Sequence, residues 1–354
     1  MKKIAFIIRN DKALLNNKIF ESETLYGMKS DNYPFKALKQ EFNKFGVEFH
    51  TYDILNPNDA DAVICLDEVD TYKKLNLSGK KSYLIISEPP VYTPENWDKK
   101  NHKYFEKVFT YDSSMCNNLK YEHYTFPIEF EKHPPFIKVN EEMYNNRHLS
   151  SIIAGAFQVS KPNKDSPSLL YERYRLIKWF TKNHPDDLHF FSRNLSSKIF
   201  EYFRGAGILN KLKLQSIVKK IAIKNFTPFK ITYKGAIPPL EKIVKQQEYN
   251  FSFCYENSKG INGCISERIF DCFAAASVPI YFGAPDIEKW IPKNCFIDKR
   301  NFNNYNELYQ FIKQMPYARY NDYLKSIEDF LNSNKINIFK VDAYANKIVN
   351  NINL

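Results

Sequence analysis

Residues 249–283 read YNFSFCYENSKGINGCISERIFDCFAAASVPIYFG, and this stretch decides the fold. Its pattern predicts a buried strand over 249–255, a polar loop with two glycines, a short helix that begins near Ser266, and an apolar strand over 278–282. Ligands bind open parallel sheets beyond the carboxyl ends of the strands, and a helix that opens after a loop offers free N–H groups to phosphate. The stretch therefore predicts either a nucleotide or phosphate site, or an ordinary parallel β-α-β unit that binds nothing.

Two charged residues open the predicted helix. Glu267 and Arg268 stand side by side in its first turn. A cation near a helix N-terminus opposes the helix dipole, so helix stability does not explain the arginine. A guanidinium binds phosphate well, which favours a ligand site. The alternative is that the two residues form an ion pair on the surface.

The same alternation of strands and helices runs through the rest of the chain. Strands are predicted over 3–8, 47–52, 62–66, 82–87, 108–111, 151–157 and 188–191, and helices over 34–45, 97–105 and 169–182. The pattern weakens over 127–147, which we interpret as a linker. We therefore predict an α/β chain of two Rossmann-like domains, residues 1–147 and 148–354, with the C-terminal helices packing back on the first domain.

The composition is that of a globular protein with an excess of positive charge. The 354 residues are 44% hydrophobic and 16% aromatic, and the net charge is +11. This charge predicts attraction to nucleic acid, to an anionic membrane surface or to a phosphorylated ligand. Six cysteines without a Cys-x-x-Cys pair predict a reducing compartment, with no disulfide framework and no zinc site. The first apolar run ends at Arg9, too early for a signal peptide, so we expect a cytoplasmic protein.

One strongly basic segment begins at Arg204 and ends at Lys234. Between Glu201 and Glu241 the chain carries eight Lys or Arg residues and no Asp or Glu. Three interpretations are open: a solvated surface helix, a peripheral contact with an anionic membrane at its inner face, or a nucleic-acid surface. Residues 209–225 contain no aromatic side chain that could stack on bases, so we expect no nucleic-acid partner.

The common catalytic motifs are missing from the sequence. It has no P-loop, G-x-G-x-x-G, H-E-x-x-H or G-x-S-x-G pattern, and its seven histidines are isolated. Carboxylates do follow predicted strands, with Glu88 in the first domain and Glu256 and Glu267 in the second. Arg173 and Arg268 are the candidate anion-binding cations. A carboxylate that faces cations across two domains suits group transfer from a phosphate-activated donor. The alternatives are a turn carboxylate and an ordinary helix-face cation.

Several short motifs together resemble one known family. ENS at 256–258, ISERIFD at 265–271 and VPIYFGAP at 278–285 closely resemble the donor-binding motif of the α1,3/4-fucosyltransferases, glycosyltransferase family 10. ISEPP at 86–90 and YKG at 233–235 agree with the bacterial members. The resemblance implies a GT-B fold, with the glycan acceptor in the first domain and GDP-fucose in the second.

The resemblance also implies roles for individual residues. By position, Glu88 is the general base, and Glu267 is a second catalytic acid that holds the ribose or the fucose of the donor. The implied donor contacts form a larger set: Arg173, Tyr255, Glu256, Asn257, Cys264, Ser266 and Arg268. Arg268 stands in place of the usual Lys, Ser266 in place of Thr, and Cys264 where some members have a Tyr on the phosphate. No metal and no cofactor are implied.

The expected function is that of an inverting glycosyltransferase. It moves L-fucose from GDP-fucose to a glycan hydroxyl, with an α1,3 or α1,4 linkage to N-acetylglucosamine or glucose in a surface polysaccharide or oligosaccharide. Three alternatives stay open: transfer of another sugar from another nucleotide, a non-catalytic protein that binds sugar nucleotides or glycans, and an anionic-surface binder explained by charge alone. Acceptor contacts come from loops that carry no readable code, so the acceptor, the linkage and the oligomeric state stay open.

Overall fold

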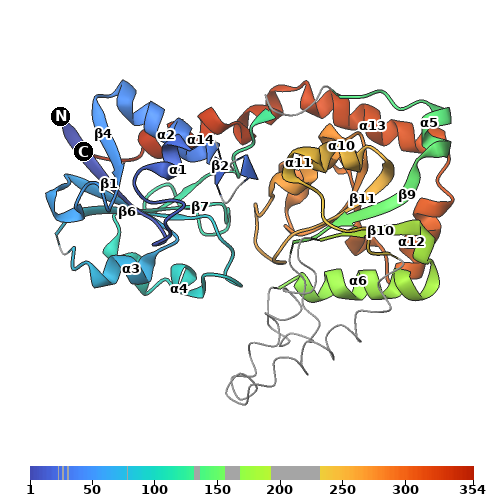
Figure 1. The fold of residues 1–354 in the computed structure, drawn as a ribbon, viewed down its shortest axis with the longest axis horizontal. Coiled ribbons are helices and arrows are strands. Elements are labelled where there is room, and N and C mark those ends of the chain that lie inside the picture. Colours follow the sequence, from blue (N-terminus) through green and yellow to red (C-terminus); the bar gives the residue numbers. More distant parts are fainter. Residues whose placement is uncertain are drawn as a thin grey trace, which may run out of the picture.

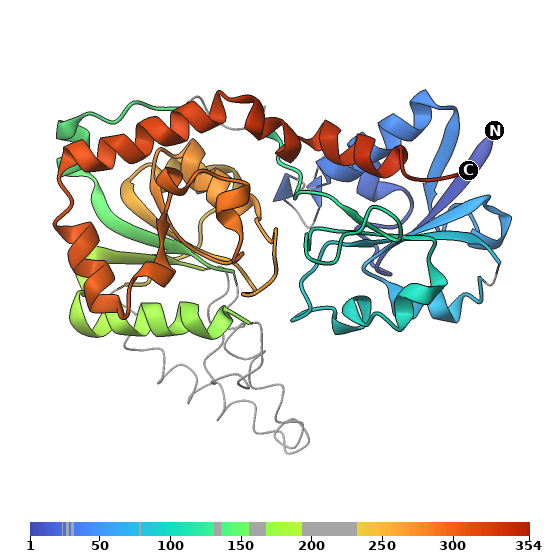
Figure 2. The same cartoon turned by 180° about the vertical axis from the view of Figure 1, so that it is seen from behind.

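Two parallel sheets, one in each half of the chain, form the framework of the molecule (Figure 1). The computed structural model describes residues 1–22, 24–25, 28–29, 32–77, 79–130, 136–155, 168–192 and 232–354. Helices cover both faces of each sheet (Figure 2). The predicted α/β fold with two parallel sheets is confirmed.

The first sheet is built from the N-terminal part of the chain. Its strands lie in the order β4 (Val47–Thr51), β1 (Lys2–Ile7), β5 (Ala62–Leu66), β6 (Lys81–Ile86), β7 (Lys107–Thr110) and β8 (Tyr121–His123), and all neighbours are parallel. Around it lie α1 (Lys18–Glu21), α2 (Tyr33–Lys44), α3 (Val69–Lys74), α4 (Pro94–Trp97) and a hairpin of β2 (Thr24–Leu25) and β3 (Met28–Lys29). The central strands are near-continuous apolar runs because both faces of the sheet are covered.

The second sheet follows a short helix, α5 (Glu141–Asn146). Its strands lie in the order β10 (Leu188–Phe191), β9 (His148–Ile153), β11 (Tyr249–Tyr255), β12 (Val278–Phe282) and β13 (Ile297–Asp298), again all parallel. One face carries α6 (Leu170–Asn183), and the other carries α10 (Lys242–Gln246), α11 (Glu267–Ala274) and α13 (Tyr317–Leu331) (Figure 1). All seven residues of β11 are buried, because this strand lies at the centre of the sheet.

Two predicted segments differ from the structure. The helix expected over 97–105 is divided into α4 and a separate 3₁₀ turn at Asn101–Tyr104. The linker expected over 127–147 contains α5, whose first turn is capped by the Asn140 side chain accepting a hydrogen bond from the Met143 N–H at 2.8 Å. The many charges of that segment hid the helix, because they leave it without an apolar face.

The C-terminal helices α12 (Tyr305–Lys313), α13 and α14 (Val341–Val349) lead the chain back to the first sheet, where α14 packs beside α2 (Figure 1). The Glu122 carboxylate, in a residue only 2% exposed, accepts hydrogen bonds from Lys107 and Lys347, each at 2.7 Å. The Tyr83 hydroxyl donates to the backbone carbonyl of Asn353 at 3.0 Å. The end of the chain is thereby joined to strands β6, β7 and β8.

The basic segment that ends at Lys234 lies outside the described residues up to position 231. Its last residues are described, and the Lys234 N–H donates to the Phe190 carbonyl at 2.9 Å, beside β10. Within the described ranges, no helix combines the length and the apolar character needed to cross a bilayer.

Candidate functional site

The site lies where the carboxyl ends of the two sheets face one another. The predicted unit at the centre of the second sheet is confirmed: β11 ends at Tyr255, α11 begins at Glu267, and β12 follows. In the first sheet β6 ends at Ile86, and Glu88 follows two residues later. The charges of Arg268 and Glu267 both act on the Glu88 carboxyl, so residues of the two domains approach one another here.

Glu256 joins the end of β11 to the start of α11. Its side chain is 1% exposed, and its two oxygens accept hydrogen bonds from the Ser266 N–H at 2.9 Å, the Ser266 hydroxyl at 2.8 Å and Arg268 Nη1 at 3.0 Å. A Cβ atom at Gly283 would lie 2.4 Å from the Glu256 Cγ, which explains the glycine at the end of β12. The structure therefore directs Glu256 into the protein as an anchor for the donor loop, which we define as residues 257–266.

Ser266 caps α11 and orients the arginine that follows it. Its hydroxyl accepts from the Arg268 N–H at 3.5 Å and from Arg268 Nη1 at 2.9 Å. Burial opposes the charge of Arg268, but Glu267 and Glu256 outweigh burial and raise the pKa of the guanidinium. Burial likewise opposes the charge of Glu267, but Arg268 and Lys242 hold its pKa below the usual value. Both residues therefore stay charged at neutral pH, at the N-terminus of a helix.

Arg173 reaches the same edge from α6. The residue is 2% exposed, and its Nη2 donates to the Tyr255 carbonyl at 2.6 Å and to Asn257 Oδ1 at 2.9 Å. Burial, assisted by Arg268, lowers its pKa to about 10, so it remains charged at neutral pH. The positive charges of Arg173 and Arg268 repel one another at the end of a central strand. A bound anion would offset that repulsion, so the two guanidiniums form a site suited to an anion.

The neighbours of Arg173 on α6 behave differently. Arg175 is exposed and donates to Glu172 at 2.9 Å. The ordinary helix-face ion pair is thus made by Arg175, whereas Arg173 points toward β11. The sequence could not separate these two arginines, because the direction of a side chain depends on how the helix packs on the sheet.

Glu88 stands on the turn that follows β6. Its side chain is exposed, yet the surrounding protein limits its hydration and raises its pKa; Arg268 and Arg9 oppose that rise, and Glu267 adds to it. Its backbone carbonyl accepts a hydrogen bond from Trp97 Nε1 at 2.9 Å. A solvent-exposed carboxylate with a raised pKa has the properties of a general base.

Two of the implied donor contacts have buried side chains. The Tyr255 ring packs edge-on against Phe282 with centroids 5.5 Å apart, and its residue is 2% exposed. Cys264 is 9% exposed and belongs to the apolar core of the first domain. Burial raises the pKa of its thiol. The structure therefore brings Glu88, Arg173, Asn257, Glu267 and Arg268 together where the two sheets face one another, and it turns the Tyr255, Glu256 and Cys264 side chains inward.

Sequence reasoning missed an interdomain contact on the donor loop. Asp286 Oδ1 accepts from the Gly263 N–H at 2.7 Å, and Asp286 Oδ2 accepts from the Ser113 hydroxyl at 3.1 Å and from Trp290 Nε1 at 3.2 Å. Ser113 belongs to the first domain, so this carboxylate ties the donor loop to both domains. No local motif signals it, because its partners are far apart in the sequence.

Gly263 is the tightest point of this contact, and it allows a test. It has a φ of +72°, and a Cβ there would lie 2.4 Å from the Tyr111 carbonyl oxygen. We expect Gly263→Ala to lower the free energy of unfolding by about 2–4 kcal/mol, as the sum of left-handed strain and overpacking. Gly260→Ala is the matched control, because Gly260 has a φ of +77° with open space around it. That substitution introduces the left-handed backbone strain without any overpacking. Equal losses in urea unfolding would show that the contact with the first domain does not matter.

Two more cleft residues carried no signal in the sequence. Tyr92 is 45% exposed, and the charges of Arg173, Arg268 and Glu88 all act on its phenol, so it lies near both the candidate base and the candidate anion site. Asp67 follows β5 and contacts the turn that bears Glu88. A search for polar residues at every strand end would have found Asp67, whereas nothing local distinguishes Tyr92.

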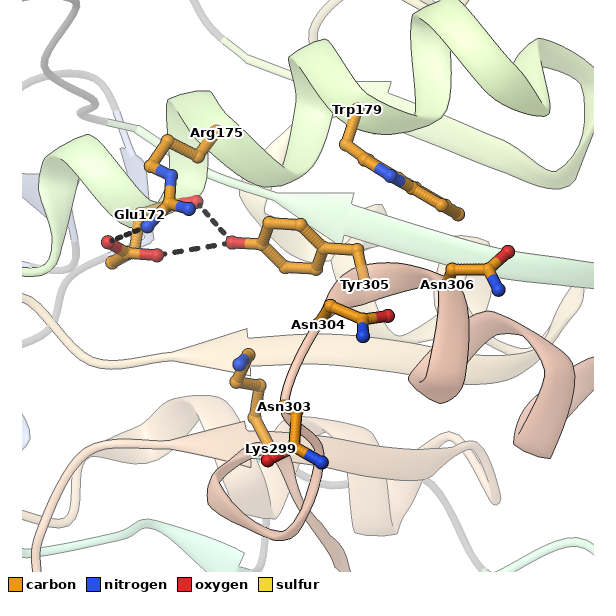
Figure 3. Close-up of a pocket in the computed structure, with 8 residues that line it drawn as sticks. All are labelled: Glu172, Arg175, Trp179, Lys299, Asn303, Asn304, Tyr305 and Asn306. Atoms are coloured by element: carbon orange, nitrogen blue, oxygen red, sulfur yellow. Dashed lines mark hydrogen bonds and ion pairs between the residues drawn. The ribbon is translucent and has the colours of Figure 1, made fainter.

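A cavity of about 400 Å³ lies along α6 (Figure 3). It is lined by Glu172, Arg175, Trp179, Lys299, Asn303, Asn304, Tyr305 and Asn306. The Tyr305 hydroxyl donates to Glu172 Oε2 at 3.2 Å (Figure 3). Glu172 is thus paired with two other residues of the lining, Arg175 and Tyr305, and Arg173 is not part of the cavity. Among the described residues, no group of three His, Cys, Asp or Glu side chains is placed to hold a metal ion.

Comparisons with known proteins relate the chain to the fucosyltransferases. Residues 212–343 match the family model "Glycosyltransferase family 10 (fucosyltransferase) C-term". An α-(1,3)-fucosyltransferase of Helicobacter pylori is 32% identical over 97 residues, which is 27% of this chain and 19% of that protein. An α-(1,4)-fucosyltransferase of Arabidopsis thaliana is 32% identical over 67 residues, 19% of this chain and 16% of that protein. The chain thus spans about a fifth of the length of these relatives.

Solved structures show the fold over nearly the whole chain. An α1,3-fucosyltransferase crystallised with GDP-fucose superposes with a TM-score of 0.51 at 16% identity, covering 100% of this chain and 91% of that one. A DNA-modifying β-glucosyltransferase superposes with a TM-score of 0.54 at 17% identity, covering 98% and 99%. These neighbours are GT-B glycosyltransferases, so the predicted GT-B fold and the resemblance to the fucosyltransferases are confirmed. The chain therefore has the GT-B fold, and its residues 212–343 resemble the C-terminal domain of glycosyltransferase family 10, the fucosyltransferases.

Proposed function

We propose that this protein is an inverting fucosyltransferase that moves L-fucose from GDP-fucose to a hydroxyl of a glycan. The observation that carries the proposal is the position of Glu88: this carboxylate of the first domain lies near enough to Arg268 and Glu267 of the second domain for their charges to act on its pKa. The family match supports fucosyl transfer. The similar α1,3-fucosyltransferase crystallised with GDP-fucose supports the choice of donor.

The proposed reaction is a single displacement. The acceptor hydroxyl oxygen attacks the anomeric carbon of fucose, the bond from that carbon to the diphosphate oxygen breaks, and the hydroxyl proton passes to Glu88. In this proposal the hydroxyl attacks from the side opposite the leaving diphosphate, which inverts the anomeric centre; the first domain supplies the base and the second supplies the diphosphate contacts. The raised pKa of Glu88 suits a base that must accept a proton. Glu267 is charged nearby and is placed to bind a donor hydroxyl or to stabilise an oxocarbenium-like transition state.

The leaving diphosphate gains negative charge as the bond breaks. In this proposal Arg173, Arg268 and the N-terminus of α11 stabilise that charge. Arg268 Nη1 donates hydrogen bonds to Glu256 and Ser266, which fix the orientation of the guanidinium. In this proposal the other two guanidinium nitrogens bind the diphosphate. These charges do the work that a divalent cation does in other sugar-nucleotide enzymes. We therefore expect excess EDTA to leave the transfer rate unchanged, and a loss that added Mg²⁺ or Mn²⁺ restores would contradict this.

A donor and acceptor screen tests the proposal. GDP-fucose, other GDP-sugars and UDP-sugars are each supplied with acceptors that end in N-acetylglucosamine or in glucose, and released nucleotide and labelled product are measured. The proposal requires a fucosylated product that forms only with GDP-fucose. Transfer of a different sugar would establish the first alternative. Binding of GDP-fucose without transfer to any acceptor would identify a non-catalytic sugar-nucleotide protein instead.

A further inference from the structure

Asp67 lies at the carboxyl edge of the first sheet, beside the turn that carries Glu88. Its carboxylate accepts the Ser87 N–H at 3.0 Å and 3.1 Å, one distance to each oxygen. The Glu88 N–H donates to Asp67 Oδ2 at 3.0 Å, and the Ser87 hydroxyl donates to the same oxygen. Three donors from two consecutive residues thus converge on one carboxylate.

Other contacts hold the carbonyl groups of the same turn. The Tyr124 hydroxyl donates to the Ile86 carbonyl at 2.7 Å, and Trp97 Nε1 donates to the Glu88 carbonyl at 2.9 Å. Both N–H groups of the turn, by contrast, end on Asp67. The position after Glu88 is Pro89, which has no N–H. Asp67 is therefore the group that fixes the backbone nitrogen from which the Glu88 side chain projects.

We propose that Asp67 is a positioning residue that sets the direction of the Glu88 carboxylate toward the acceptor hydroxyl. This inference rests on the proposed role of Glu88. Holding the N–H groups of residues 87 and 88 fixes the Cα–Cβ direction of the base, and reactive groups displaced by about 1 Å can lose 10²-fold in rate. Asp67 itself has a φ of +52°, a backbone conformation in which Asp and Asn are enriched among non-glycine residues.

We call the hydrogen bonds from Ser87 and Glu88 to the Asp67 carboxylate the clamp. The protonation state of Asp67 makes the strength of the clamp depend on pH. Burial raises its pKa to about 7; the hydrogen bonds from Ser87 oppose the rise, and the charge of Glu88 adds to it. Among the described residues, the charge of Asp67 also raises the pKa values of Cys65, Tyr111, Tyr124 and Tyr344. Their pKa values are all raised by burial, so they stay neutral near pH 7. Below about pH 7 Asp67 gains a proton and loses acceptor capacity, so the clamp weakens as pH falls.

Asp67→Asn is the variant that tests the clamp. Asparagine accepts the left-handed backbone but has one acceptor oxygen in place of two. We expect kcat to fall by about 10- to 100-fold, GDP affinity to stay at the wild-type value, and the acid limb of the pH–rate profile to move from near pH 7 to lower pH. Ser87→Ala is the matched comparison: it removes only the hydroxyl bond to Asp67 and keeps both N–H bonds. We expect it to keep the wild-type kcat above the acid limb and to move that limb to higher pH, opposite to Asp67→Asn, because the lost bond holds the pKa of Asp67 down.

Amide hydrogen exchange of Ser87 and Glu88 tests the clamp without turnover. At a pH well above 7, where Asp67 is charged, exchange at both amides should be faster in Asp67→Asn and unchanged in Ser87→Ala. If Asp67→Asn does not fold, the wild-type protein carries the test, since protection of both amides must fall below about pH 7. Wild-type kcat and wild-type exchange in Asp67→Asn, or protection that does not change with pH, would overturn the proposal. A wild-type protein that transfers no sugar, with exchange still faster in Asp67→Asn, would overturn the proposed function and leave the clamp standing.

Discussion

Replacing Glu88 with Gln is expected to abolish sugar transfer while leaving GDP binding almost intact. The amide keeps the size of the side chain but cannot take the proton of the acceptor hydroxyl, and loss of a general base costs about 10²–10⁴-fold in rate. Glu88 belongs to the first domain, and the hydrogen bonds that hold Arg173 to Tyr255 and Arg268 to Glu256 do not involve it. Release of GDP in the presence of acceptor gives kcat, and calorimetry gives the affinity for GDP.

Glu95→Gln is the matched control for this change. Glu95 lies on α4, seven residues after Glu88 in the same domain, and is half-buried. The same loss of one carboxylate there should leave kcat at the wild-type value. If Glu88→Gln retains turnover, the base is elsewhere in the cleft, and the direction of attack proposed above loses its support. A large loss of GDP affinity in Glu88→Gln would instead place this carboxylate in the donor site.

The β-α-β unit at the donor site was predictable because its information is local. The strands at 249–255 and 278–282 are apolar over their full length, which is typical of central parallel strands. Ser266 precedes an amphipathic helix and is a favoured N-cap residue. These short-range patterns fix the strands, the helix and the loop between them without help from the rest of the chain.

The role of Glu256 was less accessible to sequence reasoning. The motif marks it as a polar residue after a strand, which suggests a ligand contact. In the structure its carboxylate is buried against Ser266 and Arg268, in space that Gly283 leaves open. Only the packing of β11 against β12 brings residues 256 and 283 together. A sequence pattern shows that the carboxylate is placed at a strand end, but not whether it points to the ligand or to the protein.

The approach of Glu88 to the cations of the second domain was expected, but the other contacts between the domains were not. Asp286 binds Gly263 and Ser113, which are 23 and 173 positions away along the chain. The charge of Arg173 acts on the Tyr92 phenol only because the two domains face one another. Contacts of this kind depend on the angle between domains, which no local periodicity encodes.

Replacing Arg173 with Ala is expected to have the second large effect, on donor binding. The guanidinium supplies charge at the end of β11, and loss of a charge-assisted hydrogen bond to a phosphate costs about 1.5–3 kcal/mol, which is about 10- to 150-fold in the dissociation constant for GDP. The change also leaves the Tyr255 carbonyl and Asn257 Oδ1 without this donor. We therefore expect a lower free energy of unfolding as well, by about 1–3 kcal/mol for buried acceptors that lose their partner.

Two further variants separate charge from fold. Arg173→Lys keeps the charge but lacks the planar fork that spans two acceptors, so it should recover part of the GDP affinity and less of the stability. Arg175→Ala is the control on the same helix: it breaks only the exposed pair with Glu172 and should leave GDP binding unchanged. Calorimetry with GDP and urea unfolding together decide the matter. A folded Arg173→Ala protein with wild-type GDP affinity would show that Arg173 only braces the strand end, and the diphosphate would then be held by Arg268 and the N-terminus of α11 alone.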